Sequence, residues 1–213
     1  MNTISTIYNE GFTCVIAEDA DGWVFFTADA DVDADGANGQ FGQLAAYRAD
    51  NKGSEYLANG GMGIQNGKVV FTESWGPDIA VSDANGDPLV IDGIVVSKTA
   101  YKFPGVDQHK PEAWVDSETV PYVVVPPVII QGVAGIVKGC RARATHKGKS
   151  VDCVVADVGP SSKIGELSIA ACRALGIPSS PKSGGVESAS VFYELWPGVP
   201  AQVNGVTYPL IAS

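Results

Sequence analysis

Short runs of β-branched and aromatic residues, punctuated by glycine and proline, most constrain what this chain can fold into. The 213 residues include 25 Gly and 13 Pro, and helical periodicity is rare. Gly and Pro favour turns, whereas Val, Ile, Thr and Tyr favour pleated strands. With 45% apolar residues the chain can bury a core, which argues against disorder. We therefore expect a mainly β fold and a single domain over residues 1–213, with its core at about 13–211.

Local patterns predict individual strands and one hairpin. The predicted strands cover residues 13–17, 23–28, 68–72 and 191–196, two proline-separated strands within 120–130, and a hairpin over 133–156. The hairpin is expected to turn at residues 146–149, which places Cys140 and Cys153 roughly opposite each other. A cross-strand disulfide and two free buried thiols are equally compatible with that spacing.

The stretch at residues 153–177, CVVADVGPSSKIGELSIAACRALGI, predicts a strand, a tight loop and a helix. Its first four residues are apolar and β-branched, as in a buried strand. We expect the helix to begin near Lys163, with a serine at 161 or 162 as its N-cap, and to end at Gly176. The apolar face of that helix would contain Ile164, Leu167, Ala171 and Leu175.

Two carboxylates flank the loop: Asp157 follows the strand, and Glu166 lies in the expected first turn of the helix. Glycoside hydrolysis needs two carboxyl groups across the scissile bond, one protonated and one ionised. Burial behind an apolar strand favours a protonated Asp157, whereas a helix N-terminus and Lys163 favour an ionised Glu166. A structural role, with Asp157 capping the loop, is equally compatible with this spacing.

Alternating aspartates at residues 28–36, ADADVDADG, form the most distinctive composition in the chain. In an extended segment alternate side chains share a face, so the four aspartates would present their charges together. From the residues alone we expect a solvated acidic edge strand. The segment also matches the opening of an EF-hand loop, but its last ligand position would be Gly42 instead of glutamate, so we expect no metal there. The aspartates are Asp29, Asp31, Asp33 and Asp35.

The formal net charge of −10 disfavours nucleic acid, whose phosphates would be repelled, and favours a cationic partner. A contribution to solubility alone is the alternative explanation of this negative charge. His109 and His146 lie in separate loops without a nucleophile motif, so we expect no Ser-His-Asp triad. Of the four tryptophans, one or two could stack on sugar rings, with the others in the core.

Membrane and export signals are not visible in the sequence. We find no stretch long enough to span a membrane, and residues 1–22 lack the basic and apolar pattern of a signal peptide. We therefore expect either a protein that is not exported by that route or a chain that begins after a removed signal.

Four segments, in order, resemble the fungal-type chitosanases of glycoside hydrolase family 75. They are the aspartate run, residues 50–59, the segment PYVVVP at 121–126, and residues 156–166 with their two carboxylates nine positions apart. The similar segments span about residues 25–197. The resemblance implies a double-psi β-barrel core with extra strands and one or two short helices. It also implies endo-acting, inverting hydrolysis of β-1,4-linked glucosamine polymers.

The resemblance also assigns roles to residues. Asp157 and Glu166 fall on the family's catalytic Asp and Glu, and the aspartate run (Asp29, Asp31, Asp33 and Asp35) would bind the ammonium groups of chitosan. Lys163 is expected to be a further substrate-binding residue. We expect no metal, no cofactor and a monomer. The family is typically secreted, so an extracellular location is expected, with a cytoplasmic or phage-associated one as the alternative. The alternative functions are a peptidoglycan-directed barrel enzyme and a non-catalytic polysaccharide-binding module.

Overall fold

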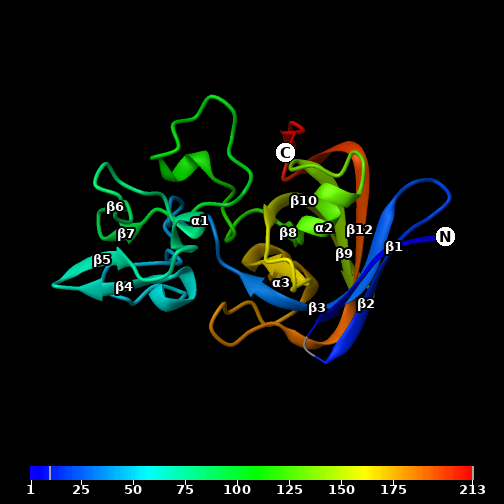
Figure 1. Ribbon diagram of the computed structural model, residues 1–213, viewed down its shortest axis with the longest axis horizontal. Helices are drawn as coiled ribbons and strands as arrows, with labels where there is room; N and C mark the ends of the chain where they lie inside the picture. The colour runs from blue at the N-terminus through cyan, green and yellow to red at the C-terminus, as the bar shows by residue number, and fades with distance from the viewer. Residues whose placement is uncertain (10, 213) are drawn as a thin grey trace. The chain divides into compact units, whose positions relative to one another are not determined.

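The computed structural model describes residues 1–9 and 11–212 and confirms a mainly β protein (Figure 1). The chain forms two compact units. Unit 1 comprises Met1–Asp33 and Thr119–Ser213, and unit 2 comprises Ala34–Glu118, so unit 2 is an insertion between two segments of unit 1. Two compact units can serve one function together, and the single-domain organisation stays a prediction.

Unit 1 is built around a closed, mixed β-barrel of six strands. The order around the barrel is β3-β11-β8-β10-β9-β12, and pairing between β3 and β12 closes it. The pairs β8–β10 and β3–β11 are parallel, and the other neighbours are antiparallel. The strands are β3 Val24–Asp33, β8 Tyr122–Val125, β9 Cys140–His146, β10 Lys149–Val158, β11 Glu166–Ser168 and β12 Val186–Val203.

Alternation along the strands separates a barrel interior from an outer wall. Successive side chains of a strand point to opposite faces, so one face of each strand can be apolar throughout. On β3, Ala28 and Ala30 belong to the buried core, while Asp29 and Asp31, which alternate with them, point to the opposite face of the strand. Phe26 on the same strand stacks on Tyr193 of β12, with ring centroids 4.7 Å apart. The small residues leave room inside the barrel for this aromatic pair.

Further elements extend unit 1. They are β1 Asn2–Asn9 and β2 Phe12–Glu18, which continue the sheet beyond β3, β13 Val206–Tyr208 beside β12, and the helices α2 Pro127–Gly132 and α3 Ile169–Leu175. Helix α3 contributes Ala171, Cys172 and Leu175 to the barrel core. Over residues 1–9 and 11–212, no helix is long and apolar enough to cross a bilayer.

The helix expected from near Lys163 begins later than predicted. Residues 163–165 are loop, β11 follows, and α3 starts at Ile169. The N-cap is Ser168, whose hydroxyl accepts a hydrogen bond from the Ala171 N–H at 3.1 Å, so the N-cap predicted at 161 or 162 is wrong. Pairing with two neighbouring strands satisfies the backbone that a longer helix would have used. The predicted end at Gly176 is confirmed, with φ of 75°.

Two other local predictions have different outcomes. The second strand expected within residues 120–130 is wrong, because Pro127 opens helix α2, where proline is favoured at the first position. The hairpin of β9 and β10 is confirmed, with positive φ at Lys147 and Gly148 in its turn, but its first strand begins at Cys140 instead of residue 133. Cys153 pairs with Ala142 instead of facing Cys140 directly, and all four cysteines are buried free thiols.

Unit 2 consists mainly of loops with short elements. These are η1 Leu57–Gly60, β4 Met62–Gln65, β5 Lys68–Phe71, α1 Gly76–Ile79, β6 Val90–Ile91, β7 Ile94–Val95 and η2 Pro111–Ala113. The predicted strand at 68–72 is confirmed as β5. A small core of Val81, Val96, Ala113 and Trp114 lies within this unit.

Candidate functional site

Three acidic residues and one valine form a row across four neighbouring barrel strands. Asp157 on β10 pairs with Val124 on β8, Val124 pairs with Glu166 on β11, and Glu166 pairs with Asp31 on β3. Residues paired in this way project from the same face of a sheet. The neighbours of Val124 and Glu166 in the chain line the barrel core, so the row lies on the outer wall.

The Glu166 side chain is held over Val124 toward the end of β10. A Cβ atom added to Gly159 would lie 2.7 Å from Glu166 Oε2 and 3.2 Å from Val124 Cγ1. The carboxylate therefore packs against the bare Cα of Gly159, two residues beyond Asp157. Any side chain at position 159 would compete with Glu166 for this space.

Lys163 joins two carboxylates of the row. Its Nζ lies 2.8 Å from Asp31 Oδ2 and donates a hydrogen bond of 3.2 Å to Glu166 Oε1. Burial alone lowers the pKa of the Lys163 ammonium, but the charges of Glu166 and Asp31 outweigh burial and raise this pKa above its ordinary value. Lys163 thus stays charged across the physiological range and pairs with both carboxylates.

Glu166 lies on a strand, so the expected effect of a helix N-terminus on its charge is wrong. The cation expected beside it is present, because Lys163 reaches it from the preceding loop. The ion pair with Lys163, and not a helix N-terminus, therefore stabilises the negative charge of Glu166.

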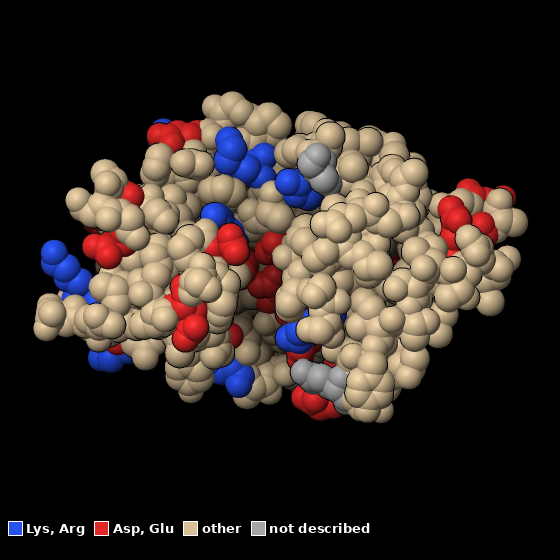
Figure 2. All heavy atoms as spheres, in the orientation of Figure 1, with Lys and Arg blue, Asp and Glu red and all other residues tan. Residues whose placement is uncertain are grey.

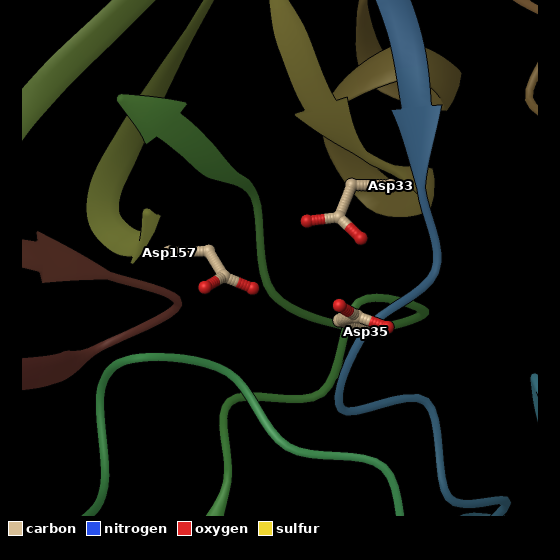
Figure 3. A group of neighbouring side chains, drawn as sticks. All are labelled: Asp33, Asp35 and Asp157. Carbon is tan, nitrogen blue, oxygen red and sulfur yellow. The ribbon is translucent and has the colours of Figure 1, made fainter. Parts of the chain in front are cut away.

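Asp33 and Asp157 face each other at the ends of β3 and β10 (Figure 3). One carboxylate oxygen of Asp33 lies within 4.8 Å of one of Asp157. The Val158 N–H donates to Asp157 Oδ1 at 2.8 Å, which helps to orient that carboxyl group. Two like charges at this distance repel, and a proton, an ammonium group or a hard metal ion relieves the repulsion. The expectation that no metal is needed stays a prediction.

Asp29 is buried and has a structural role. Its side chain is 1% exposed, and the Asn9 Nδ2 donates to both its oxygens at 3.1 and 3.2 Å. The same amide also donates to the Ile164 carbonyl at 2.9 Å, and the Asp31 N–H donates to the Gly165 carbonyl at 2.7 Å. These bonds attach the loop before β11 to β3, so Asp29 positions that loop and is too buried to contact a polymer directly.

The four aspartates of the run have different surroundings. Asp31 and Asp33 are partly exposed on β3, whereas Asp35 belongs to unit 2 and accepts hydrogen bonds from the hydroxyl groups of Tyr47 at 3.3 Å and Ser97 at 3.2 Å. The interpretation as an edge strand is wrong, because β3 has strand neighbours on both sides. Of the run, only Asp31 and Asp33 share the outer wall with Asp157 and Glu166 in a partly exposed position.

Sequence reasoning missed the residues that support these carboxylates. Asn9 is distant in the chain, and an isolated asparagine carries no local signal of its contacts. From the sequence, Gly159 and Gly165 could be predicted only as turn residues, although both approach acidic side chains closely in the structure. Val124 was predicted as a strand residue, but its place between Asp157 and Glu166 depends on strand order.

Fold and site together define a β-barrel protein with a row of acidic side chains on its outer wall. Comparisons with protein-family models and with curated protein sequences gave no match to this chain. The likeness to fungal-type chitosanases therefore stays a prediction from the four sequence segments. The case for function depends on the arrangement of the carboxylates themselves.

Proposed function

We propose that this protein is an endo-acting, inverting glycoside hydrolase that cleaves β-1,4-linked glucosamine polymers, with Asp157 and Glu166 as its carboxyl pair. The observation that carries the proposal is the row in which one strand, β8, separates the two residues. Both project from the same outer wall, as two carboxyl groups must if they are to act on one glycosidic bond.

The spacing in this row is comparable with the separation that inversion requires. Neighbouring strands lie about 4.8 Å apart, so two steps separate the Cα atoms of Asp157 and Glu166 by roughly 9.6 Å. Inverting enzymes place their carboxyl groups roughly 6.5–9.5 Å apart, which leaves room for the attacking water. Val124 lies between the two residues and presents an apolar surface beneath that space.

Within this proposal, Glu166 acts as the base and Asp157 as the acid. Lys163 stabilises the charged form of Glu166, which can then accept a proton from the attacking water. Asp157 is buried and lies next to Asp33, an arrangement that favours a proton on one of the two. That proton would pass to the oxygen of the leaving sugar as the glycosidic bond breaks.

A cationic polymer suits the charge of the surrounding surface. Asp31 and Asp33 add two partly exposed carboxylates beside the pair, and the whole chain carries a formal charge of −10. The ammonium groups of glucosamine units would relieve repulsion among these carboxylates. Lys163 is proposed to position Glu166 and Asp31 in addition to its predicted substrate contact.

Several finer features accompany this proposal. A double-psi topology is the specific form of closed six-stranded barrel that the chitosanase resemblance implies. We also propose an extracellular monomer that needs no cofactor, as that resemblance implies. The closed mixed barrel of unit 1 is compatible with that topology.

A reducing-end assay on chitosan, chitin and peptidoglycan side by side tests the function. We expect new reducing ends from chitosan, and product NMR showing the anomeric configuration opposite to that of the cleaved bond. Clearing of peptidoglycan with chitosan uncut would instead identify a cell-wall enzyme. Saturable binding without reducing ends from any polymer would identify a binding module, and either result would overturn the proposal.

The close approach of Gly159 gives a prediction about the position of Glu166. In Gly159→Ala the new Cβ would push against Glu166 Oε2, the mobile end of a side chain, so the carboxylate should shift at little expense in stability. We expect kcat on chitosan to fall at least about tenfold, since displacement of a reacting group by about 1 Å has large effects. Steady-state kinetics and a thermal melt measure both outcomes.

A matched control is Gly132→Ala. A Cβ at position 132 would meet nothing within 4 Å, so this variant should retain both activity and melting temperature. If Gly159→Ala retained full activity, Glu166 would not act from the position seen in the structure.

A further inference from the structure

Two tryptophans form a platform on the outer wall of the barrel, away from the carboxylate row. Trp23 directly precedes β3, and Trp196 lies on the adjacent strand β12. Their ring centroids are 6.3 Å apart with an interplanar angle of only 17°. Stacked rings at this separation overlap only in part, and both tryptophans keep some exposed area on the wall.

The platform borders a shallow hollow of about 380 Å³. The residues lining it are Asp21, Gly22, Trp23, Trp196, Pro197 and Val199. Both tryptophans are half-buried, and neither belongs to the barrel core. Phe25 and Phe192 support Trp23 from the same face of the sheet. The Arg141 guanidinium lies over the Trp196 ring, 4.4 Å from its centroid, and occupies that face of the ring.

The acidic loop between β2 and β3 lies beside the hollow. Glu18 ends β2, and the β2–β3 connection carries Asp19 and Asp21; acidic side chains gather over this loop at the right of Figure 2. Asp19 holds the turn, because its Oδ1 accepts hydrogen bonds from the N–H groups of Asp21 at 2.9 Å and Trp23 at 3.2 Å. The loop therefore fixes the start of β3 and places a carboxylate, Asp21, at the edge of the aromatic surface.

This surface shares the outer face of β3 with the carboxylate row. Trp23 and Asp31 are an even number of residues apart, so the two side chains lie on the same side of the extended segment. At about 3.3 Å per residue they are separated by roughly 26 Å along the strand. Aromatic rings thus mark one end of this face and carboxylates mark the other.

We propose that the Trp23–Trp196 surface is a second binding site for an amino-sugar unit of the same polymer chain. The inference takes its ligand class from the proposed function. One face of a pyranose ring is lined by C–H groups and can stack on indole, while the ammonium group pairs with Asp21. A long chain engages both ends of the β3 face, so this site raises affinity for polymers and leaves cleavage of short oligomers unchanged.

The test compares variants of the full chain in binding to chitosan beads. Glu166→Gln serves as the background, so that the polymer is not cut during the measurement. Adding Trp23→Ala, Trp196→Ala or Asp21→Asn should weaken binding roughly two- to tenfold in each case. Asp21→Asn changes an exposed loop residue, so it tests the site even if a tryptophan variant proves unstable. Trp75→Ala, which removes an exposed tryptophan of unit 2, is the matched control and should bind normally.

Activity measurements separate this inference from the proposed function. With position 166 unchanged, the platform variants should show a raised KM for chitosan but normal kcat/KM for a short glucosamine oligomer. Bead binding that is the same in all three platform variants as in the background would overturn the inference alone. Bead binding that depends on the platform, without hydrolysis by the unaltered protein, would overturn the proposed function alone.

Discussion

Replacing Glu166 with Gln, or Asp157 with Asn, is expected to lower chitosan cleavage by about 10²- to 10⁴-fold, the usual contribution of a positioned acid or base. Each substitution keeps the shape of the side chain and removes its ability to exchange a proton. The Gln carbonyl can still accept the hydrogen bond from Lys163, so the fold should persist. Reducing-end release and circular dichroism measure the two properties.

The leaving group distinguishes the two roles. An aryl glycoside with a good leaving group needs little protonation, so Asp157→Asn should recover much of its activity on such a substrate, whereas Glu166→Gln should not. The reverse order would exchange acid and base while keeping the pair. Glu187→Gln, on an exposed part of β12, is the control and should be fully active. Near-normal chitosan cleavage by either site variant would remove that residue from the catalytic pair.

Gly165→Ala is expected to destabilise the protein by roughly 2–5 kcal/mol, from left-handed strain together with steric overlap. Gly165 has φ of 97°, and an added Cβ would overlap Asp29 Oδ1 and lie 2.9 Å from the Asp29 carbonyl oxygen. The carbonyl belongs to the backbone of the buried strand β3, and the Asp29 carboxylate is held by the Asn9 amide, so neither atom can move aside easily. Urea unfolding measures the change.

A second glycine separates the two causes of this loss. Gly148 also has positive φ, at 79°, but an added Cβ there would meet nothing within 4 Å. Gly148→Ala should therefore show only the conformational strain, about 1–2 kcal/mol. Equal losses in the two variants would mean that the loop before β11 does not pack on Asp29 as tightly as the structure indicates.

The sequence predicted turns, strands and helix ends correctly where the residues that determine them lie within a few positions of one another. The turn between β9 and β10, the strand at 153–156 and the helix end at Gly176 follow from residues that prefer those conformations. The start of α3 could not be predicted in this way, because the serines at 161–162 and Ser168 are all good N-caps. Only strand pairing of Glu166 and Leu167 excludes the earlier start.

The aspartate run shows the same division. Its alternation correctly indicated an extended segment with carboxylates on one face. Whether that face is exposed depends on what packs on it, and Asn9 buries Asp29 while Asp31 remains accessible to Lys163. Burial is a property of neighbours that are distant in the chain, so composition could not assign it.

The sequence by itself determined a β-rich chain and identified Asp157 and Glu166 as the pair of carboxylates that most needed an explanation. The tertiary structure alone decided that Val124 lies between them and that Lys163 bridges Glu166 and Asp31. Strand order and register decide these contacts, and both come from pairing between segments far apart in the chain. Local preferences act over a few residues, so they can specify a strand but not the strands beside it.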